Sequence, residues 1–346
     1  RTPADPARRS LSLGGPRLKP KIYVTRRLPQ PALDRIQEVF EMAINPDDRV
    51  LTKAEIVENV RGQDALLCLL TDTIDADIMD AEKGLRVLSN YAVGYNNIDV
   101  DAATARKLPV TNTPGVLTET SADLAFTLIL SVARRVAEAD KFTRDGKFHG
   151  WGPMMLLGHD VYDKTLGIVG MGNIGSEMAK RAAGFNMNVL YFNRNKRDEE
   201  FGATYVDSLE EILERSDYIS LHNPLTPETT NMMSTDQFKL MKKSAILINT
   251  TRGPVVDQDA LYEALKSGEI AGAALDVTVP EPIPADHPLL TLDNCLIMPH
   301  VASATGDTRM KMAMMSVENV LAAVAGDWPP YCVNQTEIAG NARIKN

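Results

Sequence analysis

The sequence predicts an α/β protein with two domains, and three observations lead to that prediction. The chain has 346 residues, which is more than one typical hydrophobic core accommodates. Along most of it, short and continuously apolar runs alternate with amphipathic stretches, as buried strands alternate with helices around a parallel sheet. A long stretch of helical periodicity over residues 118–142 separates two such series, so each series is expected to build its own sheet.

The first series begins at Lys21 and ends near Thr113. Its strand-like runs are residues 21–25 (KIYVT), 65–70 (ALLCLL), 86–91 (RVLSNY) and 109–113 (PVTNT). The runs in the middle are apolar at consecutive positions, which is typical of strands buried on both faces. Helices are expected in the amphipathic stretch up to about Met42, over residues 74–83, and from near Ile98.

The second series follows residues 118–142, which predict one long helix whose first turn Thr118 and Ser121 can cap. Six apolar runs come next, with helical stretches between most of them. They are residues 165–170 (TLGIVG), 188–192 (NVLYF), 218–222 (YISLH), 245–250 (AILINT), 272–277 (GAALDV) and 295–299 (CLIMP). Six strands in this order favour a doubly wound parallel Rossmann sheet. A last helix over 305–325 is expected to return to the first domain.

Composition and charge exclude several classes of function. The net charge of −9 argues against a nucleic-acid partner, which requires a basic face. No apolar run is long enough to span a membrane. The three cysteines and five histidines lack the spacing of a metal site, so no metal is expected. Three scattered thiols fit a reducing compartment, and we expect a cytoplasmic location, with organellar import left open. Residues 1–20 are rich in Arg, Pro and Gly, and we expect a disordered tail or an expression remnant there.

A glycine motif marks the first strand of the second series. Gly170, Gly172 and Gly175 form G-x-G-x-x-G directly after a strand and before a helical run, with Asn173 and Ile174 between the last two glycines. In this context the glycines permit a tight turn and close approach of a pyrophosphate, which the helix N-terminus then binds. The motif therefore predicts a dinucleotide site.

The end of the next strand bears on the choice between NAD and NADP. An NAD site usually has an acidic residue there, which binds the ribose 2′-hydroxyl. This chain instead has Asn193, Arg194 and Asn195, followed by further cations. An arginine can bind a 2′-phosphate through a charge-assisted contact, so NADP(H) is the expected cofactor and NAD(H) the alternative.

Three ionisable residues follow the last three predicted strands. Arg252, Glu281 and His300 stand where an open α/β sheet gathers its ligands. Each alone is more typical of a structural role, but together they are the set that carbonyl reduction requires. A cation binds a substrate carboxylate and polarises the carbonyl, an acid supplies a proton, and a carboxylate holds the imidazole of that acid protonated.

These motifs resemble the D-isomer-specific 2-hydroxyacid dehydrogenase family. The matching stretches are Tyr91–Asp99 (YAVGYNNID), Val169–Gly175 (VGMGNIG), Asn249–Asp257 (NTTRGPVVD), Ala274–Pro282 (ALDVTVPEP) and Pro299–Thr305 (PHVASAT). Within the family, Trp151–Lys164 and Val277–Leu290 are most similar to the glyoxylate/hydroxypyruvate reductases. Two positions depart from the common pattern, because Ala302 and Asn96 stand where the family commonly has Gly and Asp.

The resemblance implies a role for each matched residue. Arg252 binds the carboxylate and carbonyl of a 2-keto acid, His300 donates the proton, and Glu281 orients His300. Backbone N–H groups of Val93 and Gly94 receive the substrate carboxylate. Asp276 lies at the nicotinamide, and the remaining cofactor-lining residues are Thr118, Thr250, Thr251 and Ala302, together with Arg252 and His300 themselves.

The implied fold has a discontinuous, flavodoxin-like α/β substrate domain over 21–113 and 304–346, and a dinucleotide-binding domain over 114–303. The implied activity is NADPH-dependent reduction of glyoxylate, hydroxypyruvate or both, giving glycolate or D-glycerate. Another D-2-hydroxyacid dehydrogenase, such as a phosphoglycerate dehydrogenase, and a non-enzymatic dinucleotide-sensing co-repressor remain as alternatives. The resemblance also implies a homodimer formed through the long helix and the loop after it. Whether Trp151 then reaches the partner's site or packs within its own subunit is left open.

Overall fold

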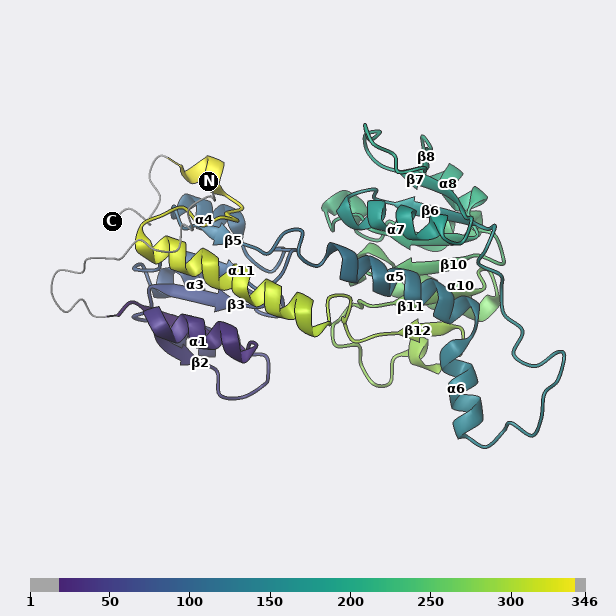
Figure 1. The fold of residues 1–346 in the computed structure, drawn as a ribbon, viewed down its shortest axis with the longest axis horizontal. Coiled ribbons are helices and arrows are strands. Elements are labelled where there is room, and N and C mark those ends of the chain that lie inside the picture. Colours follow the sequence, from purple (N-terminus) through teal and green to yellow (C-terminus); the bar gives the residue numbers. More distant parts are fainter. Residues whose placement is uncertain (1–18, 340–346) are drawn as a thin grey trace, which may run out of the picture. The chain divides into compact units, whose positions relative to one another are not determined.

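The computed structural model describes residues 19–339 (Figure 1). The described chain divides into two compact units. The first takes residues from both ends, up to Pro114 and from Arg309 onward, and the second is Gly115–Thr308. The predicted tail, residues 1–20, lies outside the described residues apart from Lys19 and Pro20. No helix among residues 19–339 is long and apolar enough to cross a bilayer.

The first unit is built on a five-stranded parallel sheet with the strand order β2-β1-β3-β4-β5. This order is that of flavodoxin-like folds, which confirms the predicted architecture. Helices pack their apolar faces on the sheet, and residues such as Ile56, Ile78 and Leu108 join Leu66 and Leu88 of the strands in its core. The strands are β1 (Lys21–Val24), β2 (Glu41–Ile44), β3 (Ala65–Cys68), β4 (Val87–Asn90) and β5 (Val110–Thr111). The helices are α1 (Gln30–Val39), α2 (Lys53–Val60), α3 (Ala76–Ala81), α4 (Val100–Ala105), α11 (Gly306–Ala325) and α12 (Gln335–Ile338).

The C-terminal segment completes this first sheet. The hydroxyl of Ser89 in β4 donates to the carbonyl of Ser316 in α11 (3.1 Å). Asn319 of α11 donates to the carbonyl of Asn112 (3.2 Å). Beyond the helix, Asn334 is buried and its side-chain oxygen accepts from the backbone N–H of Val110 in β5 (3.0 Å). Residues more than 200 positions apart in the sequence therefore form one core.

The second unit has a seven-stranded parallel sheet in the order β12-β11-β10-β9-β6-β7-β8. Strands β7 and β8 lie on one side of β6 and strands β9 to β12 lie on the other, as in the predicted Rossmann sheet. The strands are β6 (Thr165–Val169), β7 (Asn188–Phe192), β8 (Thr204–Tyr205), β9 (Tyr218–Leu221), β10 (Ile246–Asn249), β11 (Gly272–Leu275) and β12 (Cys295–Ile297). The helices are α5 (Thr118–Ala133), α6 (Val136–Arg144), α7 (Asn173–Ala183), α8 (Leu209–Arg215), α9 (Thr235–Leu240) and α10 (Gln258–Ser267), with short 3₁₀ turns η1 (Pro227–Thr229), η2 (Gly253–Val255) and η3 (Pro288–Thr291).

Two cores cover the two faces of this sheet. Ile246 and Ile248 of β10 pack with residues of α5 and α7, such as Ile129 and Met178. Leu247, the residue between them, belongs to the other core with residues of α8, α9 and α10. Successive side chains of a strand point to opposite faces, so continuous apolar strands require helices on both sides.

The long helix predicted over 118–142 is wrong as a single element. It is divided into α5 and α6 by Arg135, which adopts the left-handed conformation (φ 53°). Arg135 forms a two-point ion pair with Glu138 (2.6 and 2.8 Å), and its Nη1 donates to the carbonyl of Leu157 (3.2 Å). The predicted caps are also wrong, because α5 begins after Leu117 and has no side-chain cap. Thr118 and Ser121 lie within its first turns.

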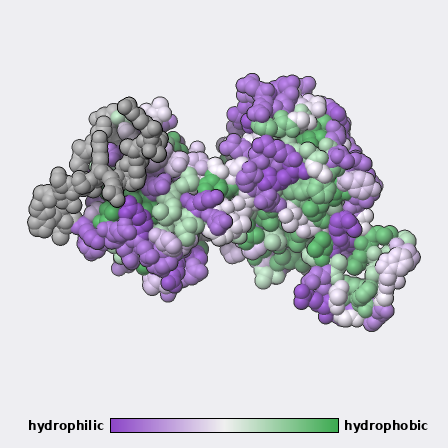
Figure 2. All heavy atoms as spheres, in the orientation of Figure 1, coloured by the Kyte–Doolittle hydropathy of each residue, from purple (hydrophilic) through white to green (hydrophobic). Residues whose placement is uncertain are grey.

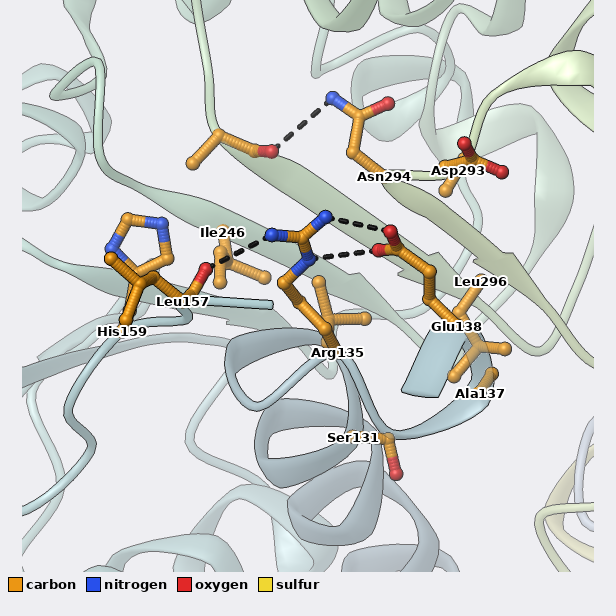
Figure 3. A pocket seen from close by; sticks show the side chains of 13 residues that line it. Ser131, Arg135, Ala137, Glu138, Leu157, His159, Ile246, Asp293, Asn294 and Leu296 are labelled. Atoms are coloured by element: carbon orange, nitrogen blue, oxygen red, sulfur yellow. Dashed lines mark hydrogen bonds and ion pairs between the residues drawn. The ribbon is translucent and has the colours of Figure 1, made fainter. Parts of the chain in front are cut away.

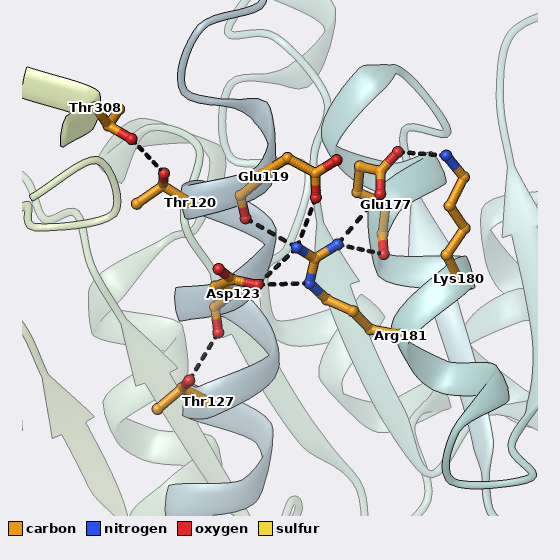
Figure 4. Close-up of polar contacts among 8 residues, drawn as sticks. All are labelled: Glu119, Thr120, Asp123, Thr127, Glu177, Lys180, Arg181 and Thr308. Atoms are coloured by element: carbon orange, nitrogen blue, oxygen red, sulfur yellow. Dashed lines mark hydrogen bonds and ion pairs between the residues drawn. The ribbon is translucent and has the colours of Figure 1, made fainter. Parts of the chain in front are cut away.

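Arg181 of α7 joins this helix to the beginning of α5 (Figure 4). Its guanidinium donates to Asp123 (2.6 Å) and to Glu119 (2.7 Å) of α5, and to Glu177 of its own helix (3.3 Å). Lys180 pairs with Glu177 from the exposed side (2.5 Å). Three carboxylates thus share one partly buried cation.

Replacing Arg181 by alanine is expected to lower the free energy of unfolding by about 1–2 kcal/mol, because the three carboxylates then face one another without their shared cation. Urea unfolding followed by circular dichroism measures the change. The matched control is Lys180→Ala, which removes an exposed pair and is expected to cost less than about 0.5 kcal/mol. Equal losses in the two variants would show that Arg181 has no special role in joining the helices.

Candidate functional site

The residues predicted for the site in the second unit mostly follow carboxyl ends of its strands. Gly170 follows β6, Asn193 follows β7, and Thr250 to Arg252 follow β10. Asp276 follows β11, and His300 lies three residues after β12. All strands of a parallel sheet end at one edge, and ligands bind at that edge in open α/β sheets. Local sequence motifs are in this way gathered along one side of the unit.

The glycine loop has the form that a pyrophosphate requires. Gly170 has a φ of +97°, and a Cβ atom on it would lie 2.5 Å from the backbone nitrogen of Asn223. A Cβ on Gly175 would lie 2.5 Å from the carbonyl oxygen of Gly170, so helix α7 packs closely on its own loop. A Cβ on Gly172 would meet nothing within 4 Å. This open space lies at the beginning of α7, whose first residues Asn173 and Ile174 receive no side-chain cap.

A helix N-terminus with open space before it and no capping side chain fits a phosphate group, since its N–H groups and dipole favour an anion. The residues present therefore fit the pyrophosphate of a dinucleotide.

The polar residues of the segment after β7 form two groups, one that bonds to the glycine loop and one that is exposed. The side-chain oxygen of Asn193 accepts from the N–H of Met171 within the glycine loop (2.6 Å). Arg197 donates to the carbonyl of the same Met171 (2.8 Å), and no local sequence signal points to this contact. Arg194 and Asn195 are exposed. The predicted group thus contains one residue that supports the glycine loop and two that face solvent.

Arg252 lies in a turn that a buried asparagine organises. Asn249, at the end of β10, accepts from the N–H and the hydroxyl of Thr251 (3.0 and 2.8 Å) and donates to the carbonyl of Arg252 (3.0 Å). The Nη1 of Arg252 donates to the carbonyl of Thr251 (2.7 Å). Burial lowers the pKa of Arg252, and the negative charge of Glu281 offsets part of this lowering. Thr250, the other predicted residue of this turn, is half-buried.

His300 and Glu281 form a direct pair. The Nδ1 of His300 lies 2.6 Å from Oε1 of Glu281, although 19 residues separate them. Burial acts to raise the pKa of Glu281, but the hydrogen bond and charge of His300 outweigh it, so the pKa lies below its ordinary value. At neutral pH the carboxyl is therefore an anion and accepts from the imidazole. The opposite ring nitrogen, Nε2, is then the group available to a substrate.

Asp276 fixes the backbone turn that carries His300. The carbonyl of Asp276 accepts from the N–H of His300 (2.9 Å), and its two carboxylate oxygens accept from Val301 and Ala302 (2.8 Å each). His300 has a φ of 55°, a conformation uncommon for a residue with a side chain. Burial raises the pKa of Asp276, while the two backbone bonds oppose this. Its carboxylate is accordingly engaged with the His300 turn.

The other predicted residues lie in two places. Thr118 is half-buried at the first position of α5. Val93 and Gly94 belong to the first unit, in the loop after β4. Their carbonyl oxygens accept from Asn112 (2.8 Å) and Asn90 (2.9 Å), and their N–H groups have no acceptor among residues 19–339.

Comparison with known proteins decides the family. The model of the D-isomer specific 2-hydroxyacid dehydrogenase NAD binding domain matches residues 126–302. A glyoxylate reductase of Korarchaeum cryptofilum is 53% identical over 322 residues, which cover 92% of this chain and 97% of the relative. This chain belongs to the D-isomer specific 2-hydroxyacid dehydrogenase family.

Solved structures agree with this membership. The TT0316 protein of Thermus thermophilus is 46% identical, with a TM-score of 0.86 over 90% of this chain and 99% of that one. An NADPH-dependent glyoxylate/hydroxypyruvate reductase of Sinorhizobium meliloti is 32% identical, with a TM-score of 0.81 over 92% of this chain and 99% of that one. The predicted α/β fold, the family and the enzyme class are confirmed. The protein is an NAD(P)-dependent dehydrogenase, and its cofactor is a nicotinamide dinucleotide.

A cavity of about 290 Å³ lies at the opposite edge of the same sheet (Figure 3). Ile246 at the beginning of β10 and Cys295 at the beginning of β12 line it, with Arg135 and Glu138 forming their ion pair on one side. None of the predicted catalytic, substrate-binding or cofactor-binding residues lines this cavity. The cavity is therefore separate from the candidate site at the carboxyl edge.

His222 of the dehydrogenase follows β9 and has a buried ring nitrogen. Its Nε2 lies 2.8 Å from the hydroxyl of Ser220, while Nδ1 is buried and has no partner among the described residues. Burial lowers the pKa of this imidazole to about 4. The ordinary pKa of a histidine is about 6.5. Between that pH and about pH 4, the imidazole of His222 binds a proton in the unfolded chain but not in the folded chain. The free energy of unfolding therefore falls as the pH falls through this interval.

We expect the unfolding free energy of the wild type to fall by about 2 kcal/mol more than that of His222→Gln between pH 6.5 and pH 4.5. The measurement is urea unfolding at several pH values in that interval. The comparison of slopes cancels any constant effect of the substitution. Parallel slopes would contradict a neutral His222 in the folded chain.

Proposed function

We propose that this dehydrogenase reduces glyoxylate to glycolate with NADPH, and that it reduces hydroxypyruvate to D-glycerate in the same way. The supporting observation is the Glu281–His300 pair at 2.6 Å, on the same sheet edge as Arg252 and the glycine loop. The named activities of the relatives from Korarchaeum cryptofilum and Sinorhizobium meliloti support the choice of substrate.

The nicotinamide dinucleotide supplies a hydride when bound. Arg252 binds the carboxylate and the carbonyl oxygen of the 2-keto acid, and its positive charge stabilises the oxygen as that atom becomes negative. His300 donates a proton from Nε2 to the same oxygen. Glu281 accepts from Nδ1, which fixes the ring and favours its protonated form. For Val93 and Gly94 we propose that their free N–H groups receive the substrate carboxylate.

We also propose residues that bind the cofactor. Gly170, Gly172, Asn173, Ile174 and Gly175 bind the pyrophosphate. Asp276 and Ala302 position the nicotinamide through the His300 turn. Thr118, Thr250 and Thr251 line the same edge, with Asn193 supporting the glycine loop and Arg194 and Asn195 facing the adenosine ribose.

The preference for NADPH rests on Arg194, which has no acidic neighbour at positions 193 and 195. Arg194→Ala is expected to raise the dissociation constant of NADPH about 10-fold or more and to leave that of NADH within about 2-fold, because only NADPH carries the 2′-phosphate. Cofactor fluorescence titration measures both constants. An Arg194→Ala variant that weakens both cofactors equally would contradict recognition of the 2′-phosphate by this residue.

We further propose a homodimer formed through the predicted long helix, which is α5 and α6 in the structure, and the loop after it. Large apolar side chains are exposed along α6 and the loop after it, in the part at the lower right of Figure 2 where green atoms lie beside white and purple ones. Trp151 is 82% exposed, Met154 76% and Tyr162 58%. A soluble monomer rarely exposes so many large apolar side chains in one segment, and a second copy would cover them. Size-exclusion chromatography with light scattering tests this, and a monomer at micromolar concentration would exclude it.

Initial rates of glyoxylate and hydroxypyruvate reduction, each with NADPH and with NADH, test the proposed reaction. Rapid NADPH oxidation with glyoxylate and slower NADH oxidation are expected. Equal rates with both cofactors would overturn only the cofactor preference. Absence of turnover with both keto acids would overturn the substrate assignment, and 3-phosphohydroxypyruvate would be the next substrate.

A further inference from the structure

The loop that carries Glu281 packs against the segment that follows Arg252. This loop leaves β11 and passes Thr278 and Val279 before it reaches Glu281. Gly253, the residue after Arg252, packs against it so closely that a Cβ would lie 2.0 Å from the carbonyl oxygen of Thr278. The two segments therefore meet through backbone contact.

A second contact is made by Gln258, the first residue of α10. Its side-chain nitrogen donates to the carbonyl of Val279 (2.5 Å), and its side-chain oxygen accepts from the N–H of the same residue (2.8 Å). Gln258 is 7% exposed. The helix does not need it as a cap, since Asp257 accepts from Ala260 in that role (3.1 Å). Both polar groups of a buried amide are thus used on one backbone unit of the Glu281 loop.

Hydrogen bonds of Thr278, the residue before Val279, link the backbone at Val279 to Glu281. The N–H of Thr278 donates to Oε2 of Glu281 (3.4 Å), and the hydroxyl of Thr278 donates to the carbonyl of Pro280 (2.9 Å). The other oxygen of Glu281 holds His300. A shift of Val279 therefore moves the carboxylate that orients the imidazole.

We infer that Gln258 is a positioning residue that connects the segment of Arg252 to the loop of Glu281 and so holds the Glu281–His300 pair in place. The inference rests on the proposed function for the roles of those three residues. Gln258 acts through backbone and touches no reacting atom. Its removal should affect proton transfer more than cofactor binding.

Two substitutions separate this role from general packing. Gln258→Leu removes both hydrogen bonds at every pH. In Gln258→Glu a protonated carboxyl still donates and accepts, whereas a carboxylate can only accept and faces the carbonyl of Val279. Burial favours the protonated form of such a carboxyl, so the change falls within the working pH range. The Gln258→Glu variant should thus resemble the wild type at low pH and Gln258→Leu at high pH.

The first experiment is the pH dependence of kcat and KM for glyoxylate reduction by wild type, Gln258→Leu and Gln258→Glu. We expect kcat of Gln258→Leu to fall about 10-fold or more, which is part of the roughly 100- to 10,000-fold that general acid catalysis contributes, with little change in the NADPH dissociation constant. The ratio of Gln258→Glu to wild type should decline by a similar factor from pH 5.5 to pH 8.5. Gln237→Glu, at a glutamine that bonds the N–H of Ser234 (3.3 Å), is the matched control and should show a constant ratio. A pH-independent ratio for Gln258→Glu would overturn the inference.

The second experiment does not depend on turnover. In protein labelled with ¹⁵N-histidine, the Nδ1 proton of His300 is assigned by its loss in Glu281→Gln. It should also be lost in Gln258→Leu, and in Gln258→Glu at high pH only, with circular dichroism confirming that each variant is folded. If the wild type fails to reduce glyoxylate but these spectral changes occur, the proposed function fails and the positioning role stands. If the proton persists in a folded Gln258→Leu, the positioning role fails regardless of activity.

Discussion

Replacing His300 by alanine is expected to lower kcat for glyoxylate reduction at least about 100-fold, because the variant has no group to protonate the developing alkoxide. Steady-state rates at saturating NADPH measure this loss. Binding of the cofactor should change little, since the turn at residue 300 is held by backbone bonds to Asp276. The loss should therefore appear in kcat.

His159→Ala provides the control for this first prediction. His159 is exposed beside the cavity at the opposite sheet edge, and its one described hydrogen bond is made by its backbone N–H, to Ala133 (2.8 Å). Its loss should leave kcat within about 2-fold, because His159 lies at the sheet edge opposite to His300. A His300→Ala enzyme with near-normal kcat would remove His300 from the reaction.

Replacing Arg252 by alanine is expected to lower kcat at least about 100-fold and to raise the KM for glyoxylate about 10-fold or more, because one charge serves both binding and stabilisation of the transition state. Arg252→Lys should recover little of the activity, since an ammonium group lacks the planar fork that binds a carboxylate at two points. Rates over a wide range of glyoxylate concentration separate the two parameters.

The two variants should thus differ in the kinetic parameters that change. His300→Ala should change mainly kcat, whereas Arg252→Ala should change both kcat and KM. Arg215→Ala removes an exposed arginine that pairs with Glu211 within α8 and is the matched control. Unchanged KM and kcat in Arg252→Ala would show that the substrate carboxylate is bound elsewhere.

Most of the fold could be predicted because continuous apolar runs are strong local signals. All six strands predicted for the second unit are present, as are β1, β3, β4 and β5 of the first. The strands without a predicted counterpart, β2 and β8, lie at sheet edges and are short or partly exposed. Edge strands need not be apolar on both faces, so their sequences do not stand out.

The division of the long helix at Arg135 could not be predicted, because the apolar periodicity continues across it. The left-handed residue there has a side chain, so no glycine marks the position. Besides its ion pair with Glu138, the side chain of Arg135 bonds to the carbonyl of Leu157, 22 residues further on. A local pattern carries no information about such a partner.

The candidate site shows the same limit. The glycine motif is local, and its residues could be named from spacing alone. The supports of the site are not local, because Arg197 holds Met171 across 26 residues and Gln258 holds Val279 across 21. The local sequence around an arginine or a glutamine does not indicate that its side chain bonds to the backbone of another loop.

The return of α11 and Asn334 to the first sheet also determines when that sheet can be completed during synthesis. Strands β1 to β5 leave the ribosome first, yet the residues that bond to Ser89 and Val110 come after residues 115–308. At roughly 5–20 residues per second, translation of that interval takes on the order of ten seconds or longer. While the second unit is being synthesised, the first unit therefore lacks its C-terminal contacts. The unit whose synthesis begins first is the last to be completed.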